Sequence, residues 1–129
     1  MILTAAAATC LALNVYFEAR NQDTDGQILV AEVTMNRVAD DRFPDEICAV
    51  VWQNKAFSWT HDGKPDVPKN IEAWLKAQIV SYKILLNGCD FCNGATHYHA
   101  LSVNPYWSDK LTPVGTWGGH KFYIEEAQG

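Results

Sequence analysis

The 129-residue sequence has little positive charge and no long apolar run. Its 10 Lys and Arg residues are outnumbered by 15 Asp and Glu residues, which gives a net charge of −5. Domains that bind nucleic acid usually carry a basic stripe or patch, so this balance argues against a nucleic-acid partner. No segment reaches the roughly 18 consecutive apolar residues that a membrane-spanning helix needs. We therefore expect neither nucleic-acid binding nor stable membrane insertion.

Targeting and cofactor motifs are also missing. The apolar opening, residues 1–13, has no Lys or Arg and runs directly into a polar helical segment, unlike a secretory signal peptide. There is no Gly-rich phosphate loop and no HExxH metal motif. The sequence therefore predicts a chain without a signal peptide that is made in the cytoplasm and uses no cofactor and no metal.

Cysteine is sparse, with four residues in the chain. Cys10 and Cys48 lie in apolar helical patterns, so we expect them to be small buried thiols. Cys89 and Cys92 form a C-x-x-C, which leaves three alternatives. They are free thiols in a turn, a redox disulfide, or half of a zinc site that two nearby histidines complete. Of these alternatives we favour free thiols.

Hydrophobic periodicity predicts an α+β fold, in which a helical body carries a small antiparallel β-hairpin sheet. Alternating residues at 94–101 and 118–125 predict two paired strands, joined by a loop that carries Trp107. The chain length predicts one domain, which we expect to be a single catalytic domain over residues 1–129. Helices are expected at residues 5–19, 26–39, 45–53 and 71–87. The last helix is expected to bury an apolar stripe of Ile71, Trp74, Leu75, Ile79, Tyr82, Leu85 and Leu86.

Glu18 is the acidic residue whose surroundings in sequence indicate chemistry. It ends an apolar helical pattern in VYFEARNQ, directly after Tyr16 and Phe17. Loss of hydration and the partial negative charge of a helix C-terminus both raise the pKa of a carboxyl group. A carboxyl protonated at neutral pH can donate its proton to a departing sugar oxygen. The alternative is an ionised Glu18 in a salt bridge with Arg20 or Arg37.

Further short motifs follow Glu18-Ala19-Arg20 in order along nearly the whole chain. In this order they resemble the cell-wall hydrolase family of the spore cortex-lytic enzyme (SleB/CwlJ) type. The motifs are Gly26-Gln27, Val30-Ala31, Asn36-Arg37, Phe43-Pro44, Ile47-Cys48, Val50-Val51, Gln53, Phe57-Ser58-Trp59, residues 94–99 (GATHYH), Pro105, Trp107, Gly119-His120 and Phe122-Tyr123.

The resemblance implies a lysozyme-like (transglycosylase-like) domain that cleaves the β-1,4 bond between N-acetylmuramic acid and N-acetylglucosamine in peptidoglycan. It assigns the catalytic role to Glu18. Spore members of the family are lytic transglycosylases, which suggests a 1,6-anhydro product formed with one catalytic glutamate. Hydrolysis of the same bond by water, a muramidase reaction, is the alternative. Glycosidases that use water usually need a second carboxylate in addition to the catalytic acid. Asp23, Asp25 and Glu32 are the candidates for that second carboxylate.

The chain departs from the family pattern after Arg20, where many members have Gly-Glu-Pro and this sequence has Asn21-Gln22-Asp23. It also shows no wall-binding repeat. The combination resembles a phage endolysin-like single-domain member of the family. We therefore expect a monomer that is made in the cytoplasm, including that of a phage-infected host, and acts on the cell wall.

Sugar-binding sites combine aromatic faces with fixed polar groups. For the expected partner, the glycan strands of peptidoglycan, Trp59 and Trp107 are candidates to stack on sugar rings. For each candidate the alternative is core packing or turn chemistry. The hydrogen-bonding candidates are Gln53, Ser58, Thr96, His97 and Tyr98.

Two other functions stay open at this level. A non-catalytic glycan-binding module would use Glu18 only to hydrogen-bond a sugar hydroxyl. A cysteine amidase or peptidase would pair Cys48 or Cys89 with His97, although no local signature supports that pair.

Overall fold

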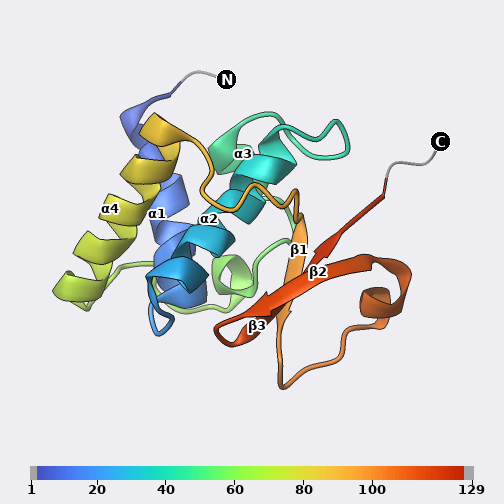
Figure 1. Cartoon of the computed structure of the whole chain (residues 1–129). Coiled ribbons are helices and arrows are strands. Elements are labelled where there is room, and N and C mark those ends of the chain that lie inside the picture. The colour runs from blue at the N-terminus through green and yellow to red at the C-terminus, as the bar shows by residue number, and fades with distance from the viewer. Residues whose placement is uncertain (1–2, 127–129) are drawn as a thin grey trace.

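The computed structural model describes residues 3–126 and shows a helical body with a small sheet along one side (Figure 1). This arrangement confirms the α+β class. The helices are α1 (Ala5–Ala19), α2 (Thr24–Val38), α3 (Ile47–Val51) and α4 (Ile71–Asn87). The strands are β1 (His97–Ala100), β2 (Thr112–Trp117) and β3 (His120–Ile124), and the 3₁₀ turns are η1 (Ser58–His61) and η2 (Tyr106–Lys110).

The long helices begin where a side chain caps the first turn. Thr4 accepts a hydrogen bond of 3.0 Å from the backbone N–H of Ala7 at the start of α1. Asn70 caps α4 in the same way. The second helix starts two residues earlier than predicted, because Asp23 is its cap and accepts a 2.8 Å bond from the N–H of Gly26.

Helix α1 lies in the middle of the helical body and packs against α2, α3 and α4. Its Leu11 and Val15 are completely buried. Helix α2 is buried on two sides. Ile28 faces the cluster around α1, whereas Val33 belongs to a second cluster with Phe122 of β3. The sheet is therefore held on the helical body through α2.

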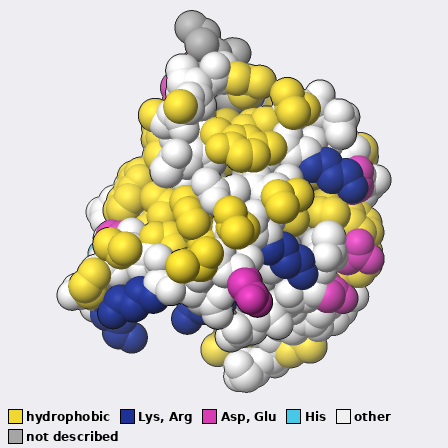
Figure 2. Space-filling model, turned by 90° about the vertical axis from the view of Figure 1, so that its left-hand side faces the viewer, with side chains coloured by type: hydrophobic (Ala, Val, Ile, Leu, Met, Phe, Trp, Pro, Cys, Tyr) yellow, Lys and Arg dark blue, Asp and Glu magenta, His cyan; other side chains and the backbone are white. Residues whose placement is uncertain are grey.

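The orientation of α4 differs from the prediction. Its core-facing residues are mainly small ones, Ala77, Val80, Ser81 and Ile84, and small side chains let a helix approach its neighbour closely. Trp74 and Leu85 pack partly against the core, as expected. The rest of the predicted stripe is exposed: Ile71, Leu75, Ile79, Tyr82 and Leu86. Figure 2 looks onto this side of the molecule and shows hydrophobic side chains over much of it.

The sheet has three strands in the order β1-β3-β2, all antiparallel. The predicted pairing of β1 with β3 is confirmed, with His97 opposite Tyr123. Strand β2 was not predicted, because Pro113 and Gly115 interrupt its pattern. It is an edge strand with a register shift between these two residues, which is where a sheet tolerates proline.

All four cysteines form disulfides, so the expectation of free thiols was wrong. Cys10 of α1 is bonded to Cys48 of α3, and Cys89 is bonded to Cys92 in the turn before β1. The Cα atoms of each pair are 5.3 Å apart, within the usual range for a disulfide. These bonds consume the sulfur atoms that a zinc site or a cysteine nucleophile would need.

In the part of the chain from residue 3 to residue 126, no helix combines the length and the apolar character required to cross a bilayer.

Candidate active site around Glu18

Glu18 lies in the last turn of α1 with its carboxyl group half-buried. The hydroxyl of Tyr98, on β1, donates a hydrogen bond of 2.8 Å to Glu18 Oε1. Burial raises the pKa of Glu18 above its usual value, because a buried carboxylate loses hydration. The Tyr98 hydrogen bond and the positive charge of Arg37 offset part of that rise. The site therefore favours a protonated carboxyl but also supports its ionised form.

Tyr98 is well placed to remain a hydrogen-bond donor. Its ring packs against those of His120 and Phe122, at centroid distances of 5.1 and 5.5 Å. Burial and the neighbouring charge of Glu18 raise the pKa of Tyr98 well above that of an ordinary phenol. The phenol consequently keeps its proton at neutral pH and can donate a hydrogen bond to the Glu18 carboxylate.

Arg37 of α2 supplies the positive charge on the other side of the site. Its Nε donates a 2.8 Å hydrogen bond to the carbonyl oxygen of Thr96. Its guanidinium lies over the rings of Phe43 and Phe57, 5.1 Å from each centroid. Burial lowers the pKa of Arg37, but from a usual value so high that the group stays charged.

The salt-bridge alternative for Glu18 is wrong. Among residues 3–126, the ion pairs within 4.0 Å involve Arg42 and Lys83, and none includes Glu18. Arg20 instead places its guanidinium 5.2 Å from the centre of the Tyr16 ring. Glu18 is thus a half-buried carboxyl with a neutral donor as its direct partner.

Glu18 and Tyr98, which are joined by a hydrogen bond, line two different cavities. The first, which we name the Gln53 cavity, has a volume of about 400 Å³. The second, the Glu18 cavity, has a volume of about 270 Å³. The Gln53 cavity is lined by Arg37, Phe43, Gln53, Asn54, Lys55, Ala56, His97, Tyr98 and Trp107. The Glu18 cavity is lined by Phe17, Glu18, Arg20, Ser58, Trp59, Asp62, Lys64, Pro65 and Asp66.

The structure brings most of the predicted binding residues to these two cavities. Gln53, His97, Tyr98 and Trp107 line the Gln53 cavity, and Ser58 and Trp59 line the Glu18 cavity. Thr96 is buried and belongs to the wall of a third cavity, while its hydroxyl lies 3.0 Å from His97 Nδ1.

The two tryptophans predicted to stack on sugars have different surroundings. Trp59 is only 5% exposed, its Nε1 donates a 2.8 Å bond to Asn14 Oδ1, and its ring stacks on Phe17. This packing leaves little of the Trp59 ring open to the cavity. Trp107 is only half-buried, and its ring lies 5.3 Å from those of His97 and Tyr123, so it contributes to an aromatic wall.

His97 is a neutral polar group in the Gln53 cavity. Burial lowers its pKa, and the positive charge of Arg37 lowers it further. A neutral imidazole has one donor and one acceptor nitrogen, which suits hydrogen bonding to an uncharged sugar.

Two carboxylates that were not predicted from the sequence line the Glu18 cavity. Asp62 and Asp66 line its wall, although they follow Glu18 by more than 40 residues. Of the acids proposed from the sequence, Asp23 caps α2. Glu32 is buried, and its carboxylate accepts three N–H bonds from the backbone of residues 90–92. Only the folding of the 62–66 loop over the end of α1 brings further acids near Glu18.

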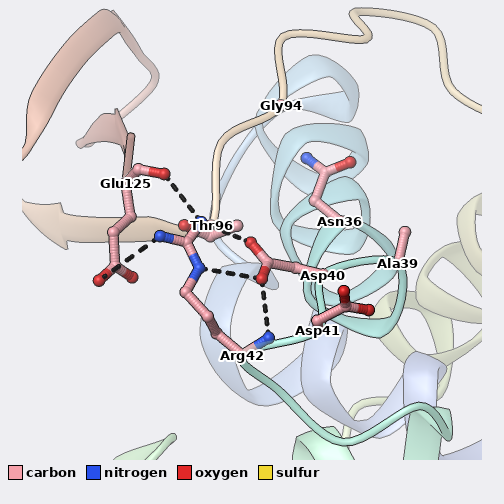
Figure 3. Close-up of a pocket in the computed structure, with 8 residues that line it drawn as sticks. All are labelled: Asn36, Ala39, Asp40, Asp41, Arg42, Gly94, Thr96 and Glu125. Carbon is pink, nitrogen blue, oxygen red and sulfur yellow. Dashed lines mark hydrogen bonds and ion pairs between the residues drawn. The ribbon is translucent and has the colours of Figure 1, made fainter. Parts of the chain in front are cut away.

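A larger cavity, about 690 Å³, lies beside this site, and its lining does not include Glu18. Figure 3 shows Arg42 between Asp40 and Glu125 on its wall. Arg42 donates hydrogen bonds to both oxygens of Asp40 and to the carbonyl oxygens of Glu125 and Glu126. Its guanidinium is therefore occupied by groups of the chain itself.

The residues that depart from the resemblance have a structural role. Gln22 Oε1 accepts a 2.9 Å hydrogen bond from the N–H of Gly119, in the turn between β2 and β3. Gly118 has a positive φ of 57° at that turn, where a side chain would also collide with Gln22. Gln22 thus fastens the sheet to the segment that directly follows Glu18-Ala19-Arg20.

Comparison with known proteins gives a consistent set of similarities. A family profile described as Cell Wall Hydrolase matches residues 21–123, and Glu18 lies three residues before this match. The spore cortex-lytic enzyme of Bacillus subtilis (strain 168) is 32% identical over 111 residues, which cover 84% of this chain and 32% of that protein. The enzyme of the same name from Halalkalibacterium halodurans is 35% identical over 88 residues, covering 68% of this chain and 25% of that protein. The chain thus spans about a third or less of these curated relatives.

Two solved structures share the fold. The catalytic domain of the germination-specific lytic transglycosylase SleB from Bacillus anthracis has a TM-score of 0.76 and 25% identity, and the match covers 94% of this chain and 96% of that one. The catalytic domain of the Bacillus cereus SleB protein has a TM-score of 0.73 and 24% identity, with coverage of 95% and 94%. The architecture described above is therefore the lysozyme-like fold of these catalytic domains.

Proposed function

This chain belongs to the cell wall hydrolase family, and from that membership we propose that it cleaves peptidoglycan glycan strands at the bond between N-acetylmuramic acid and N-acetylglucosamine. We propose further that it acts as a lytic transglycosylase, with Glu18 as catalytic acid and base. The observation that carries this assignment is the half-buried Glu18 carboxyl, which has a raised pKa, lines one cavity and is hydrogen-bonded to Tyr98 in the wall of a second. Sugars on either side of the scissile bond would occupy the two cavities.

Glu18 acts first as an acid. As the bond from muramic acid C1 to the bridging oxygen breaks, its electrons pass to that oxygen, which takes the Glu18 proton. The raised pKa of Glu18 keeps a larger fraction of this carboxyl protonated at a given pH than an ordinary glutamate would have. The carboxylate that remains is then stabilised by the Tyr98 hydrogen bond and by the charge of Arg37.

Glu18 acts next as a base. The C6 hydroxyl of the same muramic acid attacks C1, and its proton passes to the Glu18 carboxylate as the 1,6-anhydro ring closes. This step returns Glu18 to its protonated form and consumes no water. One carboxyl group therefore completes the cycle, provided that its environment supports both protonation states. Burial supports the protonated state, and Tyr98 with Arg37 supports the ionised state.

The walls of the two cavities fit a neutral glycan. Trp107 presents a half-buried aromatic ring, and Gln53 and the neutral His97 supply polar groups beside it. Such a combination of apolar faces and a few fixed polar groups is typical of sugar sites.

Hydrolysis is the second candidate, because Asp62 and Asp66 share the Glu18 cavity. Either one could activate a water molecule, as the second carboxylate of a muramidase does. Mass spectrometry of the muropeptides released from purified sacculi separates the two reactions. Transglycosylation gives muramic ends lighter by one water, whereas hydrolysis gives reducing ends. Loss of Asp66 should leave a transglycosylase active but would inactivate a muramidase that depends on it.

The catalytic role of Glu18 has its own test. Glu18→Gln keeps the shape of the side chain but removes its proton, and we expect sacculus digestion to fall by about 10²–10⁴-fold. Tyr82→Phe, on the exposed face of α4, is the matched control and should digest at the wild-type rate. An undiminished rate in Glu18→Gln would identify a different catalytic group. Binding of sacculi without cleavage by the wild type would favour a glycan-binding module.

A further inference from the structure

A third cavity, which we name the basic cavity, adjoins the Glu18 cavity. Its volume is about 360 Å³. It shares Phe17, Arg20, Lys64 and Pro65 with the Glu18 cavity, so the two lie side by side. The lining of the basic cavity is Tyr16, Phe17, Arg20, Lys64, Pro65, Val67 and Lys69.

Positive charge is concentrated in this cavity. The whole chain has 10 Lys and Arg residues and a net charge of −5, yet Arg20, Lys64 and Lys69 all line this one wall. The lining contains no carboxylate. In the described range 3–126, none of the three cations has an Asp or Glu oxygen within 4.0 Å. They are therefore available to an anion from outside the chain.

The acidic residues of the neighbouring wall belong to the Glu18 cavity. Asp62 and Asp66 line that cavity and not the basic one. Asp62 Oδ1 also accepts a 2.9 Å hydrogen bond from the backbone N–H of Lys64. The Glu18 cavity thus carries acids and cations together, whereas the adjoining basic cavity carries cations and no carboxylate.

The floor of the basic cavity is held in place by buried contacts. Tyr16 is 4% exposed, and its hydroxyl accepts hydrogen bonds of 3.2 and 3.1 Å from the N–H groups of Lys69 and Asn70. The guanidinium of Arg20 lies 5.2 Å from the centre of the same ring. These contacts fasten the 64–69 segment to α1 and keep Arg20 beside it.

We propose that the basic cavity binds carboxylates of the peptide stem on the muramic acid next to the scissile bond. This inference rests on the proposed function. The amino sugars of a glycan strand are uncharged when acetylated, so they offer no partner for three cations. The stem, joined through the lactyl group of muramic acid, carries free carboxylates close to the sugar. Arginine and lysine pair well with carboxylates, and arginine can bind both oxygens together.

The size of the effect follows from the exposure of the three cations. Each is at the surface, where an ion pair contributes about 0.2–1 kcal/mol. Together they would favour a stem-bearing substrate by about tenfold in kcat/KM, since 1.4 kcal/mol corresponds to a factor of ten. The preference should weaken as salt is added, because exposed pairs are screened.

The test compares two preparations of the same glycan strands. One keeps the free carboxylates of its stems, and in the other these carboxylates have been converted to neutral amides with a carbodiimide and ammonia. Amidation is used because removal of the stem by an amidase would leave a new lactyl carboxylate on each muramic acid. Both are freed of wall phosphate polymers, so that stem carboxylates are the anions tested. We expect the wild type to cleave strands with charged stems about tenfold faster in kcat/KM, and the ratio to fall towards one in the triple variant Arg20→Gln/Lys64→Gln/Lys69→Gln. Lys76→Gln on α4 removes one positive charge away from the cavity and should keep the wild-type ratio.

Each outcome decides the inference. A wild-type ratio near one would overturn it while leaving the proposed function intact, because cleavage itself would still be seen. A triple variant that keeps the wild-type ratio would also overturn it. If the triple variant does not fold, the salt dependence of the wild-type ratio decides, and a ratio insensitive to salt would contradict the inference. Failure to cleave either preparation would count against the proposed function instead.

Discussion

Tyr98 donates its hydroxyl hydrogen to Glu18 Oε1 over 2.8 Å, joining the sheet to the end of α1 across 80 residues of sequence. The bond favours the ionised carboxyl, whereas burial favours the protonated one. A carboxyl that must first lose and then regain a proton needs both influences. Tyr98 is therefore a positioning residue for the proposed catalytic group, in addition to lining the Gln53 cavity.

Tyr98→Phe should lower kcat/KM by about 10- to 100-fold, because a hydrogen bond to a charged group contributes about 1.5–3 kcal/mol. The structure also predicts in which direction the pKa of Glu18 changes in this variant. The Tyr98 bond lowers the pKa of Glu18, so its loss should raise that pKa further. The alkaline limb of the kcat/KM profile, where Glu18 loses its proton, should move to higher pH. A slower enzyme with an unmoved alkaline limb would contradict this role for Tyr98.

Glu18→Gln should make the protein more stable at neutral pH. The pKa of Glu18 is raised by folding, so the folded state holds its proton more tightly than the unfolded state. The contribution of Glu18 to the free energy of unfolding is fully present below the ordinary carboxyl pKa. It is lost as the pH rises through the raised pKa of the folded state. Glutamine has no charge to bury and avoids that loss. Thermal unfolding should show a higher Tm for Glu18→Gln at pH 7 and equal Tm values at a pH below the ordinary carboxyl range.

The two disulfides should differ in their contribution to stability. The Cys10–Cys48 bond spans 38 residues and the Cys89–Cys92 bond spans 3. Chain entropy predicts a loss of about 4 kcal/mol when the long loop is opened and about 1–2 kcal/mol for the short one. Urea unfolding of Cys10→Ala/Cys48→Ala and Cys89→Ala/Cys92→Ala would measure both. Equal losses would mean that loop length does not set the effect here.

Trp59→Ala and Trp107→Ala should separate stability from binding. Trp59 is buried and hydrogen-bonded to Asn14, so its truncation should cost about 3–5 kcal/mol of unfolding free energy. Trp107 is half-buried in the wall of the Gln53 cavity, and its truncation should raise KM for glycan several-fold with a smaller loss of stability. Denaturation and digestion kinetics on the same two variants provide the check. A raised KM in Trp59→Ala and the larger loss of stability in Trp107→Ala would contradict this assignment.

Much of the helical body could be predicted because its signals are local. Thr4 and Asn70 are capping residues, and each lies where a helix begins. Glu18 could be identified because its aromatic neighbours and the Glu-Ala-Arg motif are adjacent in sequence. The pairing of β1 with β3 was predictable from alternation. In each case the residues that carry the signal lie within one element.

Other features depended on tertiary packing, that is, on which face of a helix or strand packs against its neighbour. Periodicity showed that α4 has an apolar side, but packing against α1 selected the side with small residues and left Ile79 and Leu86 exposed. Strand β2 was hidden by Pro113, which an edge position tolerates. The bond between Cys10 and Cys48 depended on the packing of α3 against α1, which no spacing in the sequence reveals.

The sequence by itself determined the starts of α1 and α4, the class of the fold and the choice of Glu18 as the proposed catalytic group. Tertiary structure decided what surrounds that carboxyl. Tyr98 reaches it from the sheet, Asp66 lines its cavity from a distant loop, and Lys64 and Arg20 line both that cavity and the adjoining basic cavity. The physical reason is that pKa and charge complementarity depend on distances through space. Those distances were set only when α1, the 62–69 segment and β1 packed together.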